Sequence, residues 1–101
     1  MAPKRLRKLE AQSDGAGRQV FVARSVRARL LGLALLRDLP RDCALLLPRC
    51  RSVHTFGMRF PLEIRFLDER GEVIRSERRV PAGRILCEPG AYAVLERRSP
   101  A

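Results

Sequence analysis

The most regular alternation of apolar and polar side chains lies in PLEIRFLDERGEVIRSERRV, residues 61–80. In an extended strand, alternate residues face opposite sides of the sheet. The apolar set is Leu62, Ile64 and Phe66, and the charged set is Glu63 and Arg65. ERGE predicts a turn at Gly71, and VIRSERRV predicts another strand. We therefore expect a sheet that packs on one face, with residues 61–68 as a central strand.

Similar short segments between turns occur elsewhere in the chain. A strand is predicted in each of three segments: RQVFVA at 18–23, CALLLP at 43–48 and AYAVLE at 91–96. Ser25 can cap a helix over VRARLLGLALLRD, in which Gly32 either packs closely or marks the helix end. This pattern predicts a mainly β fold: a small single-domain antiparallel sandwich or barrel with one short helix near residues 25–37.

The chain of 101 residues has the length of one domain. Residues 1–17 are polar and lack a sustained period, which predicts a disordered basic tail before a single domain over 18–101. No apolar run reaches the roughly 18 residues of a membrane span, so we expect a cytoplasmic protein without a membrane span. The three cysteines form no CxxC pair, which favours reduced thiols.

The positive charge is concentrated in one part of the chain. Residues 1–61 hold 13 basic and 4 acidic residues, a net charge of +9, whereas residues 62–101 carry +1. This asymmetry favours an acidic protein or a polyanion as partner, although a composition rich in arginine is the alternative explanation. The candidate polyanion patch consists of Arg24, Arg27, Arg37, Arg49, Arg51 and Arg59.

Cys50, His54 and Met58 fall at even spacing and raise the question of a metal or catalytic site. The three would suit Cu(I). On a strand, however, four residues span roughly 13 Å, so only a bend near Gly57 could bring them onto one ion. A thiol–imidazole pair would need the same loop to fold back. We therefore favour structural roles here and expect no metal, no cofactor and no catalytic residue.

Three stretches of the sequence together resemble the domain of unknown function 192 family of small uncharacterised prokaryotic proteins. They are RLLGL at 29–33, ALLLPRCRSVHTFGMRFPLEIRFLDERGEVI at 44–74, and CEPGAYAVLE at 87–96. The specific elements are R-x-x-G-L and H-T-x-x-M-x-x-P. The resemblance implies a mainly β, sandwich-like single domain. It implies no activity, because none is established for the family.

Two departures from the family pattern bear on the structure. The family usually has an aspartate where this chain has Glu63, which adds a methylene to the side chain. The family also tends to continue past the A-x-x-V-L-E strand into another strand, whereas this chain ends at RRSPA. A missing final strand would leave an open sheet edge, which would favour a homodimer or lower the stability.

These observations favour a small binding or accessory domain. The alternatives are polyanion or nucleic-acid binding through the Arg-rich half, and an enzyme that uses Cys50, His54 or Glu63. Arg29 interrupts the apolar run ARLLGLALL, so we expect it to pair with Glu63 or with carbonyls around His54. The candidate ligand contacts are His54, Thr55, Arg29 and Glu63, with His54 at the mouth of a pocket.

Overall fold

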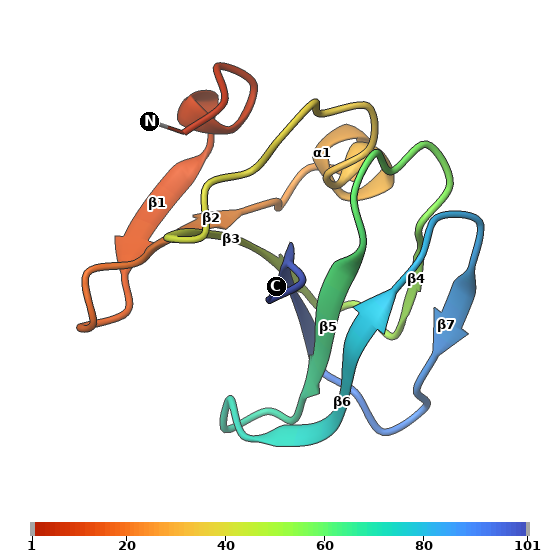
Figure 1. Ribbon diagram of the computed structural model, residues 1–101. Coiled ribbons are helices and arrows are strands. Elements are labelled where there is room, and N and C mark those ends of the chain that lie inside the picture. The colour runs from red at the N-terminus through yellow and green to blue at the C-terminus, as the bar shows by residue number, and fades with distance from the viewer. Residues whose placement is uncertain (1, 101) are drawn as a thin grey trace.

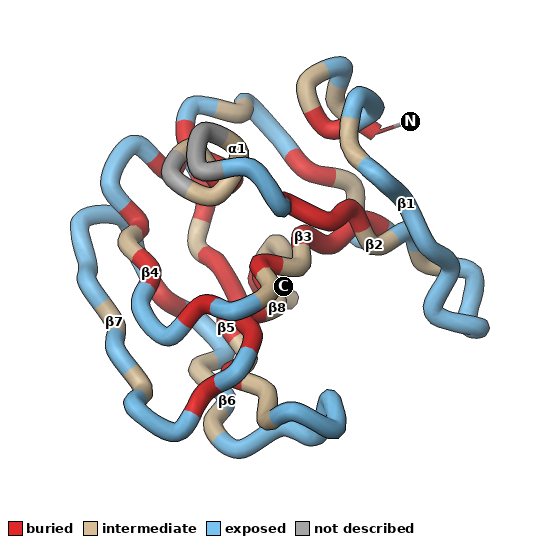
Figure 2. Tube along the Cα trace, turned by 180° about the vertical axis from the view of Figure 1, so that it is seen from behind, coloured by how far each residue is buried: buried red, intermediate tan, exposed pale blue. Residues whose placement is uncertain are grey.

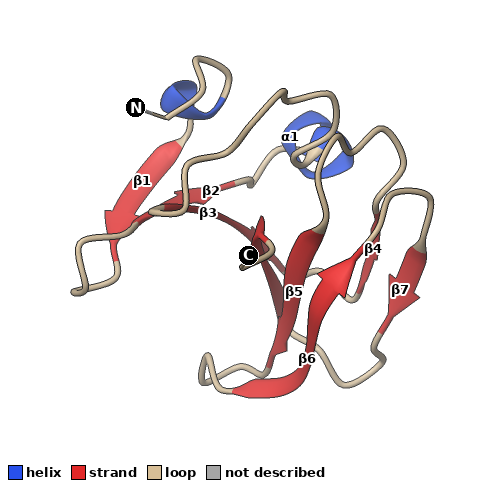
Figure 3. Cartoon of the chain, in the orientation of Figure 1, coloured by secondary structure: helices blue, strands red, loops and turns tan. Residues whose placement is uncertain are grey.

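The chain forms strands over most of its length, with one short α-helix near the middle of its first half (Figures 1 and 3). The computed structural model describes residues 2–100, and the side chains of Val26, Arg27 and Leu30 lie outside that description. The helical elements are η1 (Leu6–Lys8) and α1 (Val26–Leu31). The strands are β1 (Glu10–Ser13), β2 (Gln19–Val22), β3 (Cys43–Pro48), β4 (Ser52–His54), β5 (Leu62–Leu67), β6 (Val73–Val80), β7 (Ile85–Cys87) and β8 (Ala93–Arg98).

The strands form two sheets. The main sheet has six strands in the order β1-β2-β3-β8-β5-β6, and β4 pairs with β7 in a second sheet. Figure 1 shows the second sheet on the far side of β5 and β6 from the β1–β2 hairpin. The prediction of a mainly β fold with one short helix is confirmed, and the main sheet is open, not closed into a barrel. One pair departs from the antiparallel pattern: β2 and β3 run parallel, because the segment containing α1 returns the chain across the sheet.

Strand β5, predicted to be central, is an interior strand of the main sheet, one position from the edge strand β6. It pairs with β6 on one side and with β8 on the other. Leu62, Ile64 and Phe66 are fully buried on one face, while Glu63 and Arg65 lie on the opposite face and form an ion pair. The alternation therefore identified correctly which side of the sheet faces the core.

Helix α1 begins after the predicted cap Ser25 but ends at Leu31, earlier than the predicted end near residue 37. The Ser25 hydroxyl accepts a hydrogen bond from the Ala28 amide at 3.0 Å, which caps the first turn. Gly32 has a φ of 50° and ends the helix at Leu31, so the helix is shorter than the segment VRARLLGLALLRD. The residues beyond Gly32 form a loop that buries Leu33 and Leu39 instead.

The structure describes a path for residues 2–17, the part of the predicted disordered tail that it covers. Leu6 is buried in the core, and β1 pairs with β2. Arg5 donates hydrogen bonds to the carbonyl oxygens of Gly32 and Ala34, at 2.7 and 2.8 Å. Sequence periodicity could not indicate β1, because all four of its residues are exposed and it presents no apolar face.

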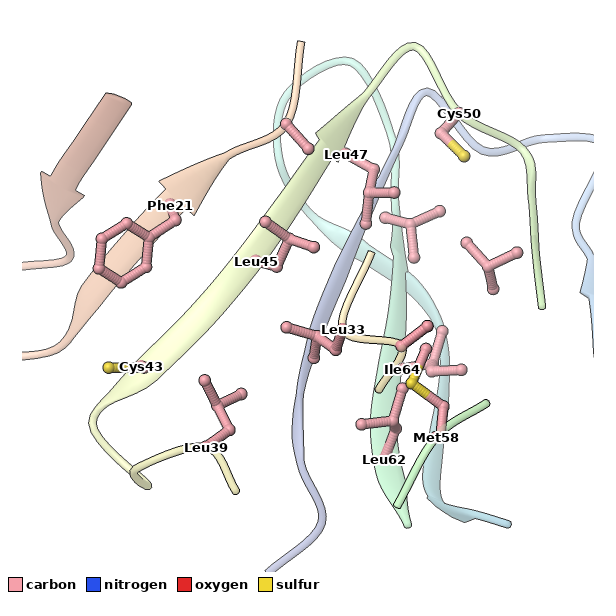
Figure 4. Packing of buried hydrophobic residues seen from close by; sticks show 14 of the residues in the cluster. Phe21, Leu33, Leu39, Cys43, Leu45, Leu47, Cys50, Met58, Leu62 and Ile64 are labelled. Atoms are coloured by element: carbon pink, nitrogen blue, oxygen red, sulfur yellow. The ribbon is translucent and has the colours of Figure 1, made fainter. Parts of the chain in front are cut away.

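The core lies against one face of the main sheet. Register places Leu45 and Ile64 on either side of Glu96, and it places Leu47 and Phe66 on either side of Val94. Figure 2 shows buried residues along β3 and β5 and exposed residues along β1 and β7. In Figure 4, Leu33 and Met58 lie beside Leu62 and Ile64, so the loops around α1 and β4 cover this face.

Strand β8 is not an edge of the main sheet. It is paired with β3 and with β5, and the two edges of the sheet in the described part of the chain are β1 and β6. A homodimer formed through an edge would therefore use β1 or β6, not the last strand. No helix among the described residues is long and apolar enough to cross a membrane.

Replacing Ile64 by alanine should remove core packing from the interior strand β5. Ile64 is fully buried, so we expect a loss of about 2–5 kcal/mol in the free energy of unfolding, measured by urea denaturation. The matched control is Ile85→Ala, because Ile85 is 67% exposed and its loss should change stability by only about 0.5 kcal/mol. Equal losses in the two variants would contradict this placement of the core.

Candidate functional site

A cavity of about 390 Å³ opens beside the C-terminal end of α1. Its lining comes from α1, from β3 and the segment after it, from β4 and the loop that follows, and from β7 and β8. The apolar lining includes Leu31, Leu47, Val53 and Met58. Two exposed apolar residues, Phe56 and Ile85, also line it. The cavity is therefore a largely apolar space next to the core.

Glu96 lines the cavity and is the feature that the sequence interpretation missed. It lies on the apolar face of the main sheet between Leu45 and Ile64 and is only 2% exposed. Its Oε1 atom is buried and has no hydrogen-bond partner among the described residues. Burial raises the pKa of the Glu96 carboxyl to about 7. The signal was present in AYAVLE, because Glu96 falls two residues after the core residue Val94.

Gly32 lets the end of α1 approach this carboxyl. A Cβ atom at position 32 would lie 3.4 Å from Oε1 of Glu96, at the tight limit of ordinary van der Waals contact. The φ of 50° at this position also favours glycine. The glycine of the R-x-x-G-L element thus both ends the helix and leaves room above Glu96.

Arg29 and His54 line the same cavity. Arg29 lies in the last turn of α1 and donates a hydrogen bond to the carbonyl oxygen of Arg49 at 2.8 Å, so its partner is a backbone carbonyl and not Glu63. His54 is partly buried, and its Nδ1 atom accepts a hydrogen bond from the Phe56 amide at 3.2 Å. The His54 ring stacks on Phe56 with 5.6 Å between centroids. The structure therefore brings together two of the four residues proposed as ligand contacts.

The other two residues, Thr55 and Glu63, lie elsewhere. Thr55 is fully buried; its hydroxyl donates to the Pro81 carbonyl at 2.7 Å and accepts from the Arg84 amide at 2.8 Å. These bonds tie the loop after β4 to the segment between β6 and β7. Glu63 is 3% exposed on the opposite face of the sheet, where it pairs with Arg97 at 2.6 Å and Arg65 at 3.1 Å. Neither side chain is among those that line the cavity.

The cavity is lined by Cys50, His54 and Met58 together. A turn at Gly57, with a φ of 78°, allows these residues to lie close to one another. The Cys50 thiol donates to the Ser52 carbonyl at 3.1 Å. Within residues 2–100, no group of three His, Cys, Asp or Glu side chains is arranged to hold a metal ion. The loop does fold back, but the Cys50 thiol and the His54 Nδ1 atom each have a backbone partner.

The described arginines of the candidate polyanion patch have different neighbours. Arg49 and Arg51 line a second hollow of about 560 Å³, together with Arg29, Ser52 and Tyr92. The others are spread out: Arg24 pairs with Glu10, Arg37 is exposed in the loop after α1, and Arg59 lines a third hollow with Arg79. The side chain of Arg27 lies outside the described residues.

The geometry combines three kinds of surface in one place. A buried carboxyl lies at the sheet, apolar side chains surround it, and a guanidinium and an imidazole lie nearer the solvent. Such a combination can hold a small molecule by burying an apolar body and pairing its polar ends.

The family model of the domain of unknown function 192 family, DUF192, described as "Uncharacterized ACR", matches residues 8–99. The chain belongs to this family. The elements on which the resemblance rested converge in space: R-x-x-G-L supplies Arg29 and Gly32, H-T-x-x-M supplies His54 and Met58, and V-L-E supplies Glu96. No curated protein matches the chain.

Two solved structures similar to this one are bacterial. One is from Sinorhizobium meliloti 1021 and is named as a proposed transcription regulator. Its TM-score is 0.73 and its sequence identity is 20%, and the match covers 81% of this chain and 69% of that chain. The other is a protein of unknown function from Novosphingobium aromaticivorans DSM 12444, with a TM-score of 0.72 at 15% identity over 98% of this chain and 88% of that one. At these identities the likeness establishes the fold alone.

Replacing Glu96 by glutamine should change how stability depends on pH. The folded-state pKa of about 7 exceeds the ordinary value of 4.5, so Glu96 contributes most stability below about pH 4.5 and loses that contribution as the pH rises through 7. Between about pH 5 and pH 8, the wild type should lose about 2–3 kcal/mol more than Glu96→Gln does. Urea denaturation at both pH values measures this, and parallel losses would show that Glu96 is not buried as described.

Proposed function

We propose that this protein is a binding domain that holds a small amphipathic anion in the cavity beside α1. The observation that supports this most is the position of Arg29, a cation beside a largely apolar cavity of about 390 Å³. That volume falls in the range of roughly 300–1,000 Å³ that is common for small-molecule sites.

Apolar burial and charge pairing would act together in this site. A short apolar chain would pack on Leu31, Leu47 and Val53, with about 0.8 kcal/mol gained for each methylene removed from water. The acidic group would meet the Arg29 guanidinium, which has five N–H donors and matches the two oxygens of a carboxylate. The contact between Arg29 and the Arg49 carbonyl would hold the guanidinium in position.

Hexanoate is a suitable first probe, because it has one carboxylate and a short apolar chain. Arg29→Ala should weaken hexanoate binding at least tenfold, the loss expected for a charge-assisted hydrogen-bonded pair of about 1.5–3 kcal/mol. Titration followed by amide NMR shifts measures the affinity and the residues that respond. The control is Arg37→Ala, which removes the same charge from an exposed position away from the cavity. Equal weakening in both variants would contradict a specific role for Arg29.

A second candidate function is binding of a polyanion, including nucleic acid, at the neighbouring hollow. Arg29, Arg49 and Arg51 line this hollow together, and the last two are exposed. The Sinorhizobium meliloti protein of similar fold is named as a proposed transcription regulator. Contacts to phosphates through arginines would bind without sequence preference and would weaken steeply with salt.

Fluorescence anisotropy with a labelled DNA duplex tests the second function. The double variant Arg49→Ala/Arg51→Ala should weaken binding more than Arg37→Ala/Arg59→Ala, although both lose two charges. In Arg49→Ala/Arg51→Ala, the slope of log affinity against log salt should also become shallower by about 2, because this variant loses two phosphate contacts. The same weakening in both pairs would mean that only net charge matters.

Catalysis by Cys50, His54 or Glu63 has less support. Cys50 and His54 share the cavity, but Glu63 lies on the other face of the main sheet and pairs with two arginines. The three side chains therefore do not form one constellation.

A further inference from the structure

We propose, on the basis of the proposed function, that the ligand of the cavity also carries an amino group that pairs with Glu96. The ligand class is then a small zwitterion: an acidic group held by Arg29, a short apolar chain, and an ammonium group at the inner end beside Glu96. This inference deepens the proposed function, which concerns only the acidic end of the ligand.

The first observation is the unsatisfied oxygen of Glu96. A buried polar atom without a hydrogen bond costs free energy, and the large majority of buried polar atoms in proteins have a partner. The Oε1 atom of Glu96 lacks one among the described residues, although the residue is 2% exposed and lines a cavity. A donor that enters the cavity would satisfy this atom.

The second observation is the contrast with Glu63. The two glutamates are almost equally buried, at 3% and 2% exposure, and they lie on opposite faces of the same sheet. Glu63 has two cationic partners, Arg97 and Arg65. No ion pair joins Glu96 to any described residue, in a chain that has 21 basic residues. A ligand can therefore provide the cation that pairs with Glu96.

The surroundings of Glu96 define the two ends of the ligand. Three titratable side chains line the cavity with it, one each from α1, the segment after β3, and β4: Arg29, Cys50 and His54. The neighbouring strands β3 and β5 present apolar side chains on either side of it: Leu45 and Ile64. The charges therefore run from a carboxyl inside to a guanidinium outside, and a complementary ligand has the opposite order.

Proton balance supports an ammonium group at this position. Burial raises the pKa of Glu96 to about 7, so at neutral pH the carboxyl is close to half ionised. When an ammonium group binds, Glu96 loses its proton to solvent and an ion pair forms in the apolar cavity. Binding should therefore weaken below pH 7, by about tenfold between pH 8 and pH 6 for a pKa of about 7.

Three probes of equal chain length test this inference: 6-aminohexanoate with both groups, hexanoate with the acid only, and hexylamine with the amine only. Isothermal titration calorimetry near pH 8 should show 6-aminohexanoate binding at least tenfold tighter than either of the others. In Glu96→Gln the advantage of 6-aminohexanoate over hexanoate should disappear, because the ammonium group loses its ionised partner.

The outcomes separate the two proposals. If hexanoate binds through Arg29 but the amino group adds nothing, this inference fails and the proposed function stands. If neither acid binds, the proposed function fails, and this inference fails with it. If hexylamine binds as tightly as 6-aminohexanoate, the ligand is not two-ended and the inference is also overturned.

The pH profile gives a test on the wild type that needs no variant to fold. The affinity for 6-aminohexanoate should fall about tenfold from pH 8 to pH 6, whereas the affinity for hexanoate should not fall. A flat profile for 6-aminohexanoate would overturn the inference. Glu63→Gln serves as the matched control: its side chain is equally buried but lies on the other face, so the selectivity between probes should be unchanged.

Discussion

The main sheet has one apolar face, and the rest of the structure follows from covering that face. Its other face carries Glu63 in ion pairs with Arg65 and Arg97. Charged groups such as these require either water or an oppositely charged partner. The loop after α1 and the loop after β4 must therefore both pack on the apolar side of the sheet. They do so with Leu33 and Leu39, which lie far from β5 in sequence, and with Met58, which lies shortly before it. The cavity lies where α1 and the β4–β7 sheet meet over this face.

The family element H-T-x-x-M has two separate roles within this arrangement. His54 and Met58 face the cavity, whereas Thr55 faces the segment between β6 and β7 and holds the loop through both of its hydroxyl bonds. The turn at Gly57 lets the chain reverse between these contacts. A loop fixed in this way presents its side chains to the cavity from a rigid support, which suits a preformed binding site.

Two glutamates in one sheet have different environments and therefore different chemistry. Glu63 is buried with two arginines, so its charge is compensated within the protein. Glu96 is buried among apolar side chains, and its raised pKa reflects that isolation. Residue type and burial are the same for both, so the difference arises from the neighbours that the strand register places beside each. Perturbed carboxyls of this kind often occur at functional sites.

Local sequence patterns predicted the faces of β5, the cap at Ser25 and the family, and they left open whether Gly32 packs closely or ends the helix. These features depend on neighbouring residues, because alternation and capping act over a few positions. The path of residues 2–13, the parallel β2–β3 pair and the location of Glu96 in the cavity were not predicted. Each depends on contacts between distant parts of the chain: Arg5 with Ala34, β2 with β3, and Glu96 with Gly32. A pattern in the sequence indicates which way a side chain points, but the strands and loops that surround it are brought there by the fold as a whole.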